Sequence, residues 1–86
     1  SGNHIGHDAV IDDHNFISSH VVISGFVHVK SHCFLGVNAT FRDSIVVEKE
    51  NIIGAGAVIM KSTQEKGVYL PERAKLFHKT SDEIEL

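Results

Sequence analysis

Histidine and aspartate are concentrated in the first part of the chain. Residues 4–20, HIGHDAVIDDHNFISSH, contain four of the seven histidines and three aspartates, with no lysine or arginine. Imidazole changes its charge near neutral pH, so a histidine can act as a general base and take a proton from a nucleophile. Histidines together with a carboxylate can also bind a zinc or iron ion. Which chemistry is available depends on the elements that position these side chains.

Large apolar residues recur every six positions along most of the chain. A helix repeats apolar residues at three and four positions and an isolated strand at two, so a period of six fits neither. This period is typical of the hexapeptide repeats that form a parallel β-helix. The ten residues in this register are Ile5, Ile11, Ile17, Ile23, Val29, Leu35, Phe41, Val47, Ile53 and Ile59.

The hexads predict an all-β fold, a parallel β-helix of about three coils over residues 1–63. Each hexad gives one short strand and a turn, and three hexads close a triangular coil of 18 residues. Successive coils would stack about 4.8 Å apart. A β-sandwich is the alternative, but it needs turns at roughly 8–12-residue spacing and alternating faces. The strict period of six disfavours a sandwich.

Beyond the hexads the period breaks. The segment STQEKG is a polar loop, and VYL can form one more strand. Pro71 can start a helix that continues to about His78. Thr80 and Glu83 fit a capping box at the start of a second short helix. We therefore expect residues 64–86 to form a strand and helical tail that caps the last coil.

The hexads begin at once at the N-terminal end, and no residue before Ile5 caps the first coil. Bare strand edges are a liability, and terminal repeats are normally atypical. We therefore expect this chain to be the C-terminal part of a longer protein.

Residues 18 positions apart should stack on successive coils. Gly25 would lie above His7 and leave room for a ligand close to the imidazole. The same spacing also fits an exposed corner histidine and a turn glycine. His14, His32 and Glu50 share another column, but neighbours about 4.8 Å apart place its ends too far apart for one metal ion. A solvated ladder is the favoured interpretation there.

Two segments resemble the left-handed β-helix acyltransferases. IGAGAVIMKS (53–62) is similar to their closing repeat, and IGHDAVIDDHNFIS (5–18) resembles a subgroup of nucleotide-sugar N-acetyltransferases and sialic acid O-acetyltransferases. Their catalytic histidine lies in an I-x-H-D-x-x-I hexad. The resemblance covers about residues 5–76. It implies a homotrimer with active sites between adjacent subunits that transfers acetyl from acetyl-CoA to an amino or hydroxyl group of a sugar, expected to be nucleotide-linked.

The resemblance also implies the site residues. His7 would be the general base, and Asp8 would fix its tautomer or stabilise the imidazolium. Backbone N–H groups would hold the oxyanion. The residues that would line the acetyl-CoA groove are Gly25, Gly36, Gly54 and Ala55.

Two departures from the acyltransferase pattern leave other functions open. Relatives often carry a second histidine nine residues after the base, where this chain has Phe16, and they tend to close with G-N-P-A-K, where it has YLPERAKL. One alternative is a non-catalytic trimeric scaffold. The other is a metal enzyme like the γ-class carbonic anhydrases, which place three histidines around zinc between subunits. Two of those histidines lie five residues apart, and no two histidines of this chain do.

Composition excludes several classes of partner. With a net charge of −3 and no cluster of Lys or Arg, the chain is not expected to bind nucleic acid or a membrane surface. Its apolar runs are far shorter than a membrane span, and its first residues are not a signal peptide. Because its single cysteine cannot form an internal disulfide, we predict a reducing compartment, the cytoplasm. The small core of an 86-residue β-helix also favours oligomerisation.

Overall fold

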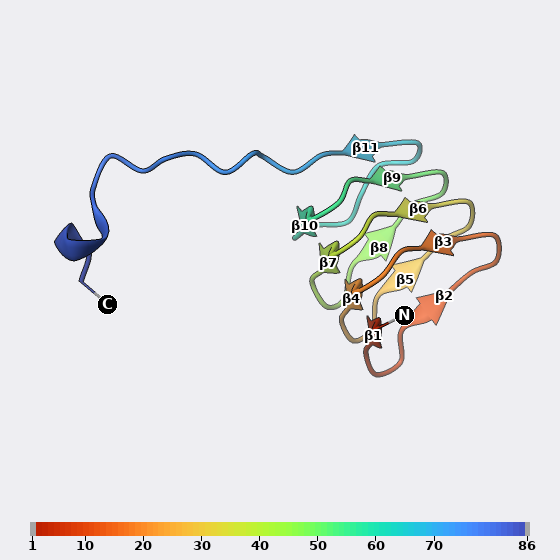
Figure 1. Cartoon of the computed structure of the whole chain (residues 1–86). Coiled ribbons are helices and arrows are strands. Elements are labelled where there is room, and N and C mark those ends of the chain that lie inside the picture. Colours follow the sequence, from red (N-terminus) through yellow and green to blue (C-terminus); the bar gives the residue numbers. More distant parts are fainter. Residues whose placement is uncertain (1, 86) are drawn as a thin grey trace.

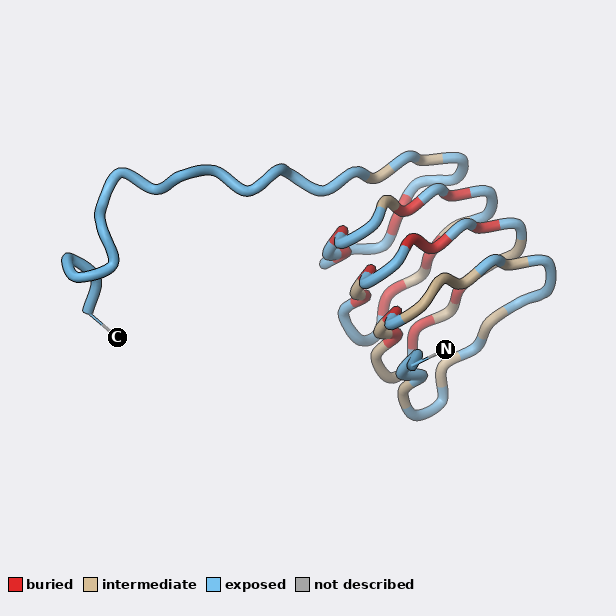
Figure 2. Tube along the Cα trace, in the orientation of Figure 1, coloured by how far each residue is buried: buried red, intermediate tan, exposed pale blue. Residues whose placement is uncertain are grey.

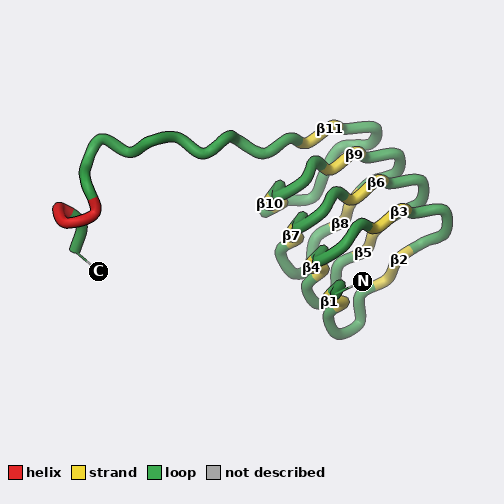
Figure 3. Tube along the Cα trace, viewed as in Figure 1, coloured by secondary structure: helices red, strands yellow, loops and turns green. Residues whose placement is uncertain are grey.

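The computed structural model describes residues 2–85. The part from His4 to Tyr69 forms three sheets of parallel two-residue strands, which are the faces of a triangular prism (Figures 1 and 3). Sheet A contains β1 (His4–Ile5), β4 (Val22–Ile23), β7 (Thr40–Phe41) and β10 (Val58–Ile59). Sheet B contains β2 (Val10–Ile11), β5 (His28–Val29) and β8 (Val46–Val47). Sheet C contains β3 (Phe16–Ile17), β6 (Phe34–Leu35), β9 (Ile52–Ile53) and β11 (Val68–Tyr69).

The strand register confirms the predicted left-handed parallel β-helix. Ile5 lies opposite Ile23, which lies opposite Phe41, so residues 18 positions apart stack as the hexads predicted. The predicted extra strand forms as β11, which pairs with β9. The eleven strands therefore make nearly four turns, somewhat more than the three that the hexads alone predicted.

The hexad positions point into the prism and form its core. Ile23, Leu35, Phe41 and Ile53 are fully buried, and their neighbours at the corners are small or β-branched (Figure 2). Burial of such side chains contributes about 1.5–3 kcal/mol each. The first coil is less covered, since Ile5 is 46% exposed.

Every corner of the prism contains a residue in the left-handed backbone conformation. Asn, Asp and His adopt this conformation several-fold more often than other non-glycine residues. Three of the seven histidines occupy such positions, so backbone geometry explains much of the histidine content. The non-glycine residues at these corners, one every six positions with φ between 56° and 65°, are Asp8, His14, His20, Phe26, His32, Asn38, Ser44 and Glu50.

The last coil closes without a fourth strand in sheet B. The chain runs through residues 60–67 from β10 directly to β11. The Ser62 hydroxyl accepts a hydrogen bond from the Val46 N–H (2.9 Å), and the Thr63 hydroxyl accepts one from the Glu48 N–H (2.8 Å). These hydroxyls satisfy the N–H groups of Val46 in β8 and of Glu48 just after it, which a further strand would have paired.

The C-terminal tail differs from the prediction. No helix forms from Pro71 to His78, and residues 71–85 are exposed and extend away from the prism (Figure 1). An isolated helix this short is marginal in water, and this one has nothing to pack against. Of the predicted capping segment 64–86, β11 covers the last coil by pairing with β9, whereas residues 71–85 do not cap it. The predicted capping box does form, at a single 3₁₀ turn (Ser81–Glu83), where the Thr80 N–H donates to the Glu83 carboxylate at 2.9 Å. No helix within residues 2–85 is long and apolar enough to cross a membrane.

Candidate active site

The turns between strands stack into three edges of the prism. The AB edge, between sheets A and B, contains residues 6–9, 24–27 and 42–45. The BC edge contains residues 12–15, 30–33 and 48–51, and the CA edge contains residues 18–21, 36–39 and 54–57. The last residue of most of these turns is buried, and the exposed side chains before it recur at fixed spacing, so each edge can present a ladder of functional groups.

The predicted base and its partner lie at the first turn of the AB edge. His7 Nε2 is 3.2 Å from Asp8 Oδ2, and the two side chains are 84% and 61% exposed. Asp8 occupies the left-handed corner position, with φ 56°. The corner conformation thus turns the carboxylate back toward the neighbouring imidazole. This is the short contact that the His-Asp pair in the sequence predicted.

The second coil packs closely on this turn. The Phe26 N–H donates a 2.9 Å hydrogen bond to the His7 carbonyl oxygen. A Cβ atom on Gly6 would lie 2.5 Å from the Gly25 nitrogen, and one on Gly25 would lie 3.2 Å from the His7 carbonyl oxygen. The backbone under His7 is therefore fixed from above, and only glycine fits at position 6.

The residues predicted to line the acetyl-CoA groove lie on two different edges. Gly25 lies on the AB edge above His7, whereas Gly36, Gly54 and Ala55 lie on the CA edge. Sheet A separates these two edges within one chain. A single groove could include all four residues only if the edges belong to adjacent subunits.

Gly36 also has a structural reason to be glycine. It is buried, and a Cβ atom there would lie 2.6 Å from the Ala55 nitrogen and 2.8 Å from the Ile53 carbonyl oxygen. Gly54 is less confined, because its nearest neighbours would be the Leu70 and Pro71 side chains at 3.1 Å. Ala55 is exposed.

The structure contains a second His-Asp pair that the sequence analysis did not identify. His28 Nε2 lies 3.0 Å from both carboxylate oxygens of Asp12, and the two side chains are 40% and 41% exposed. Asp12 follows β2 and His28 begins β5, so the pair joins the first and second coils diagonally. The signal in the sequence that could have identified this pair is the spacing of 16 residues between Asp12 and His28, close to the 18-residue stacking period.

In the column of His14, His32 and Glu50, the two imidazole rings stack on successive coils. Their centroids are 5.0 Å apart and their planes meet at 24°. Residues 2–85 contain no group of three His, Cys, Asp or Glu side chains arranged to hold a metal ion. Cys33 is buried, as expected for a small apolar residue.

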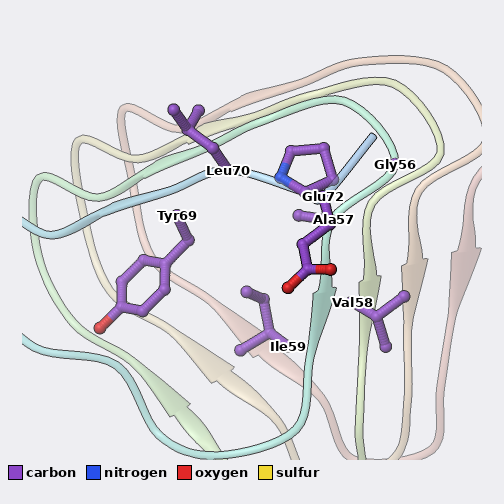
Figure 4. Close-up of a pocket in the computed structure, with 8 residues that line it drawn as sticks. Gly56, Ala57, Val58, Ile59, Tyr69, Leu70 and Glu72 are labelled. Carbon is purple, nitrogen blue, oxygen red and sulfur yellow. The ribbon is translucent and has the colours of Figure 1, made fainter. Parts of the chain in front are cut away.

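A hollow of about 430 Å³ opens beside the top of the CA edge (Figure 4). Its walls are the turn at Gly56 and Ala57, strand β10, and the segment Tyr69–Glu72 where the chain leaves the prism. The volume lies within the range of small-molecule sites, about 300–1,000 Å³. Its position next to Ala55 makes it a continuation of the CA edge.

Sheet C presents an apolar ladder to solvent. Phe16, Phe34, Ile52 and Val68 stand in register on its outer face and are 44–60% exposed. The Phe16 and Phe34 rings are nearly parallel, with centroids 5.2 Å apart. Phe16, which replaces the second histidine of the acyltransferase pattern, is therefore part of this ladder.

No protein-family model matches the chain. It is 32% identical over 79 residues to a protein named gamma carbonic anhydrase 1, mitochondrial, of Arabidopsis thaliana. The match covers 90% of this chain and 28% of that protein, so the chain spans little more than a quarter of this curated relative. The fold and this similarity together support the hexapeptide-repeat β-helix superfamily. They do not support the narrower sialic acid O-acetyltransferase subgroup that the His-Asp hexad suggested.

Proposed function

We propose that this chain transfers acetyl from acetyl-CoA to an amino or hydroxyl group of a sugar, expected to be nucleotide-linked. The main support is the pair formed by His7 and Asp8, 3.2 Å apart on an exposed turn whose backbone is fixed by the coil above. Precise placement of a base on a rigid element favours proton transfer.

The pair has a definite role in this chemistry. With His7 Nε2 3.2 Å from Asp8 Oδ2, we assign the ring proton to Nε2, which would leave Nδ1 to accept a proton. The acceptor amine or hydroxyl attacks the thioester carbonyl while its proton passes to Nδ1. The carbon–sulfur bond then breaks, and the imidazolium returns the proton to the departing CoA thiolate. Backbone N–H groups on a neighbouring turn would hold the oxyanion.

We further propose that the site forms between subunits of a homotrimer. The AB edge of one subunit, with His7 and Gly25, would face the CA edge of its neighbour, with Gly36, Gly54 and Ala55. The apolar ladder on sheet C gives the subunits a surface to bury, since exposed apolar patches often mark interaction sites.

The catalytic role is tested by acetyl transfer from acetyl-CoA, measured on the complete enzyme with a panel of amino and hydroxyl sugars. His7→Ala should remove most of the activity, whereas the matched control His14→Ala, at a corner of the BC edge, should leave it unchanged. Unchanged transfer by His7→Ala would exclude this histidine as the base.

The shared site is tested by mixing two inactive variants. Ala55→Glu places a carboxylate at an exposed position where CoA phosphates would approach, so it should block binding without disturbing the fold. If sites lie between subunits, trimers that contain both His7→Ala and Ala55→Glu chains regain one intact site. Activity that stays absent after mixing would place both residues in one subunit's site.

A second candidate is carbon dioxide hydration, favoured by the similarity to the plant protein named a gamma carbonic anhydrase. Within the described residues of one chain no three metal-ligating side chains lie together, so a zinc site of that class would need histidines from two subunits. Zinc bound in a fixed ratio to the purified protein, together with carbon dioxide hydration, would favour this candidate. A folded trimer that shows neither activity would favour the non-catalytic scaffold.

A further inference from the structure

Phe26 occupies a backbone conformation that its side chain disfavours. Its φ is 60°, in the left-handed region, where a bulky residue is an outlier. Within residues 2–85, the other non-glycine residues with positive φ have polar side chains that water or local hydrogen bonds can satisfy. Strain of this kind persists where the surrounding structure imposes it, and it is concentrated at functional sites.

Burial within the chain does not explain the choice of phenylalanine. The side chain is 60% exposed, and the core residue of this turn is its neighbour Val27, which is 1% exposed. The corner would accept Asn or Asp more readily, and the sequence uses such residues at Asp8 and Asn38.

The Phe26 ring instead contacts the proposed base. The ring centroids of Phe26 and His7 are 5.9 Å apart and their planes meet at 87°, an edge-to-face arrangement that aromatic pairs prefer. The Phe26 N–H also donates to the His7 carbonyl oxygen at 2.9 Å. One residue therefore holds both the backbone and the ring of His7.

We propose that Phe26 is a positioning residue that fixes the orientation of the His7 imidazole, with Nε2 toward Asp8 and Nδ1 toward the acceptor. This inference rests on the proposed role of His7 as the base. The His7 side chain is 84% exposed, and among residues 2–85 the Asp8 carboxylate and the Phe26 ring are the groups that contact its imidazole. The strained corner conformation is what directs the ring toward His7.

Two substitutions in the complete enzyme test the proposal. Phe26→Asn suits the corner conformation and removes the ring, while Phe26→Leu keeps an apolar side chain and removes the ring. Phe26→Asn should raise the midpoint of thermal unfolding and lower kcat about ten- to a hundredfold, with the KM for acetyl-CoA unchanged, because misplaced catalytic groups lose rate of this order. Phe26→Leu should lower kcat similarly. Glu50→Asn, at a corner of the BC edge, is the control that should raise stability and leave kcat unchanged.

NMR of the His7 ring protons provides a readout that a structural role would not affect. In both Phe26 variants these resonances should lose the ring-current shift of Phe26 and show averaging between ring orientations. A kcat within twofold of the parent enzyme in both variants would overturn the proposal. Loss of the trimer together with activity would instead assign Phe26 to the subunit interface. If His7→Ala retains full activity, the proposed function fails. If His7→Ala loses activity while both Phe26 variants stay active, only the positioning role of Phe26 is rejected.

Discussion

Replacing Gly36 by alanine should destabilise the β-helix even though it adds one methyl group. The new Cβ atom would lie 2.6 Å from the Ala55 nitrogen and 2.8 Å from the Ile53 carbonyl oxygen, both main-chain atoms of the next coil. These contacts are well inside ordinary van der Waals separation. The atoms cannot rotate away, so the two coils must separate locally.

The separation would strain the hydrogen bonds that join the coils at this edge. The Gly36 N–H donates to the Ile53 carbonyl oxygen at 2.8 Å, and the Gly56 N–H donates to the Val37 carbonyl oxygen at 2.8 Å. Overpacking of this kind typically costs about 1–3 kcal/mol. For a domain of this size, each 1 kcal/mol lowers the midpoint of thermal unfolding by about 4–8 °C. We therefore expect a decrease of about 8–16 °C for a loss of about 2 kcal/mol.

The assay is thermal unfolding followed by circular dichroism, at one fixed protein concentration because oligomerisation affects the midpoint. Gly56→Asn is the matched control on the same edge. A Cβ atom at Gly56 meets nothing within 4 Å, and its φ of 75° is one that asparagine tolerates. A Gly36→Ala midpoint within about 1 °C of the parent protein, at unchanged acetyl-CoA affinity, would refute the stacking explanation for this glycine.

Three further outcomes follow from the structure. Phe34→Asp, on the outer face of sheet C, should leave the coil folded but dissociate the proposed trimer in light scattering, and a persistent trimer would place the interface elsewhere. Burial raises the pKa of the Cys33 thiol, so a thiol reagent near pH 8 should react with the native protein at least about tenfold more slowly than in urea. The contribution of the neutral Cys33 thiol to the free energy of unfolding should be complete below the ordinary cysteine pKa. It should be lost as pH rises through the raised pKa. Hydrogen bonds from the Thr80 backbone N–H and hydroxyl lower the pKa of Glu83, so the local turn is stabilised above the ordinary glutamate pKa and loses that support as pH falls through the lowered value. The Glu83 carboxyl should therefore titrate at a lower pH than it does in Thr80→Ala, which keeps the backbone N–H and loses the hydroxyl. Identical midpoints would exclude a contribution from the hydroxyl.

The inward-facing residues could be predicted from the sequence because one six-residue period determines both the strand and the side chain that it buries. Ile23 and Phe41 are buried and stacked as the columns predicted. The contact between His7 and Asp8 could also be predicted, since the two residues are adjacent on one turn.

The rest depends on geometry that the repeat does not encode. The contact between Asp12 and His28 is diagonal across two coils, so it depends on side-chain rotamers rather than on the 18-residue register. The helix predicted from Pro71 is absent because local helical preference is weak without a packing surface. The division of the proposed site between two edges appears only when hexads are assigned to sheets.

Acetyl-CoA binding, measured by calorimetric titration of the trimeric protein, tests the central claim most directly. We expect saturable binding of about one acetyl-CoA per subunit, lost in Ala55→Glu and retained in His14→Ala, whose side chain lies on the BC edge. A folded trimer that releases no heat of binding would contradict acetyl transfer by this chain.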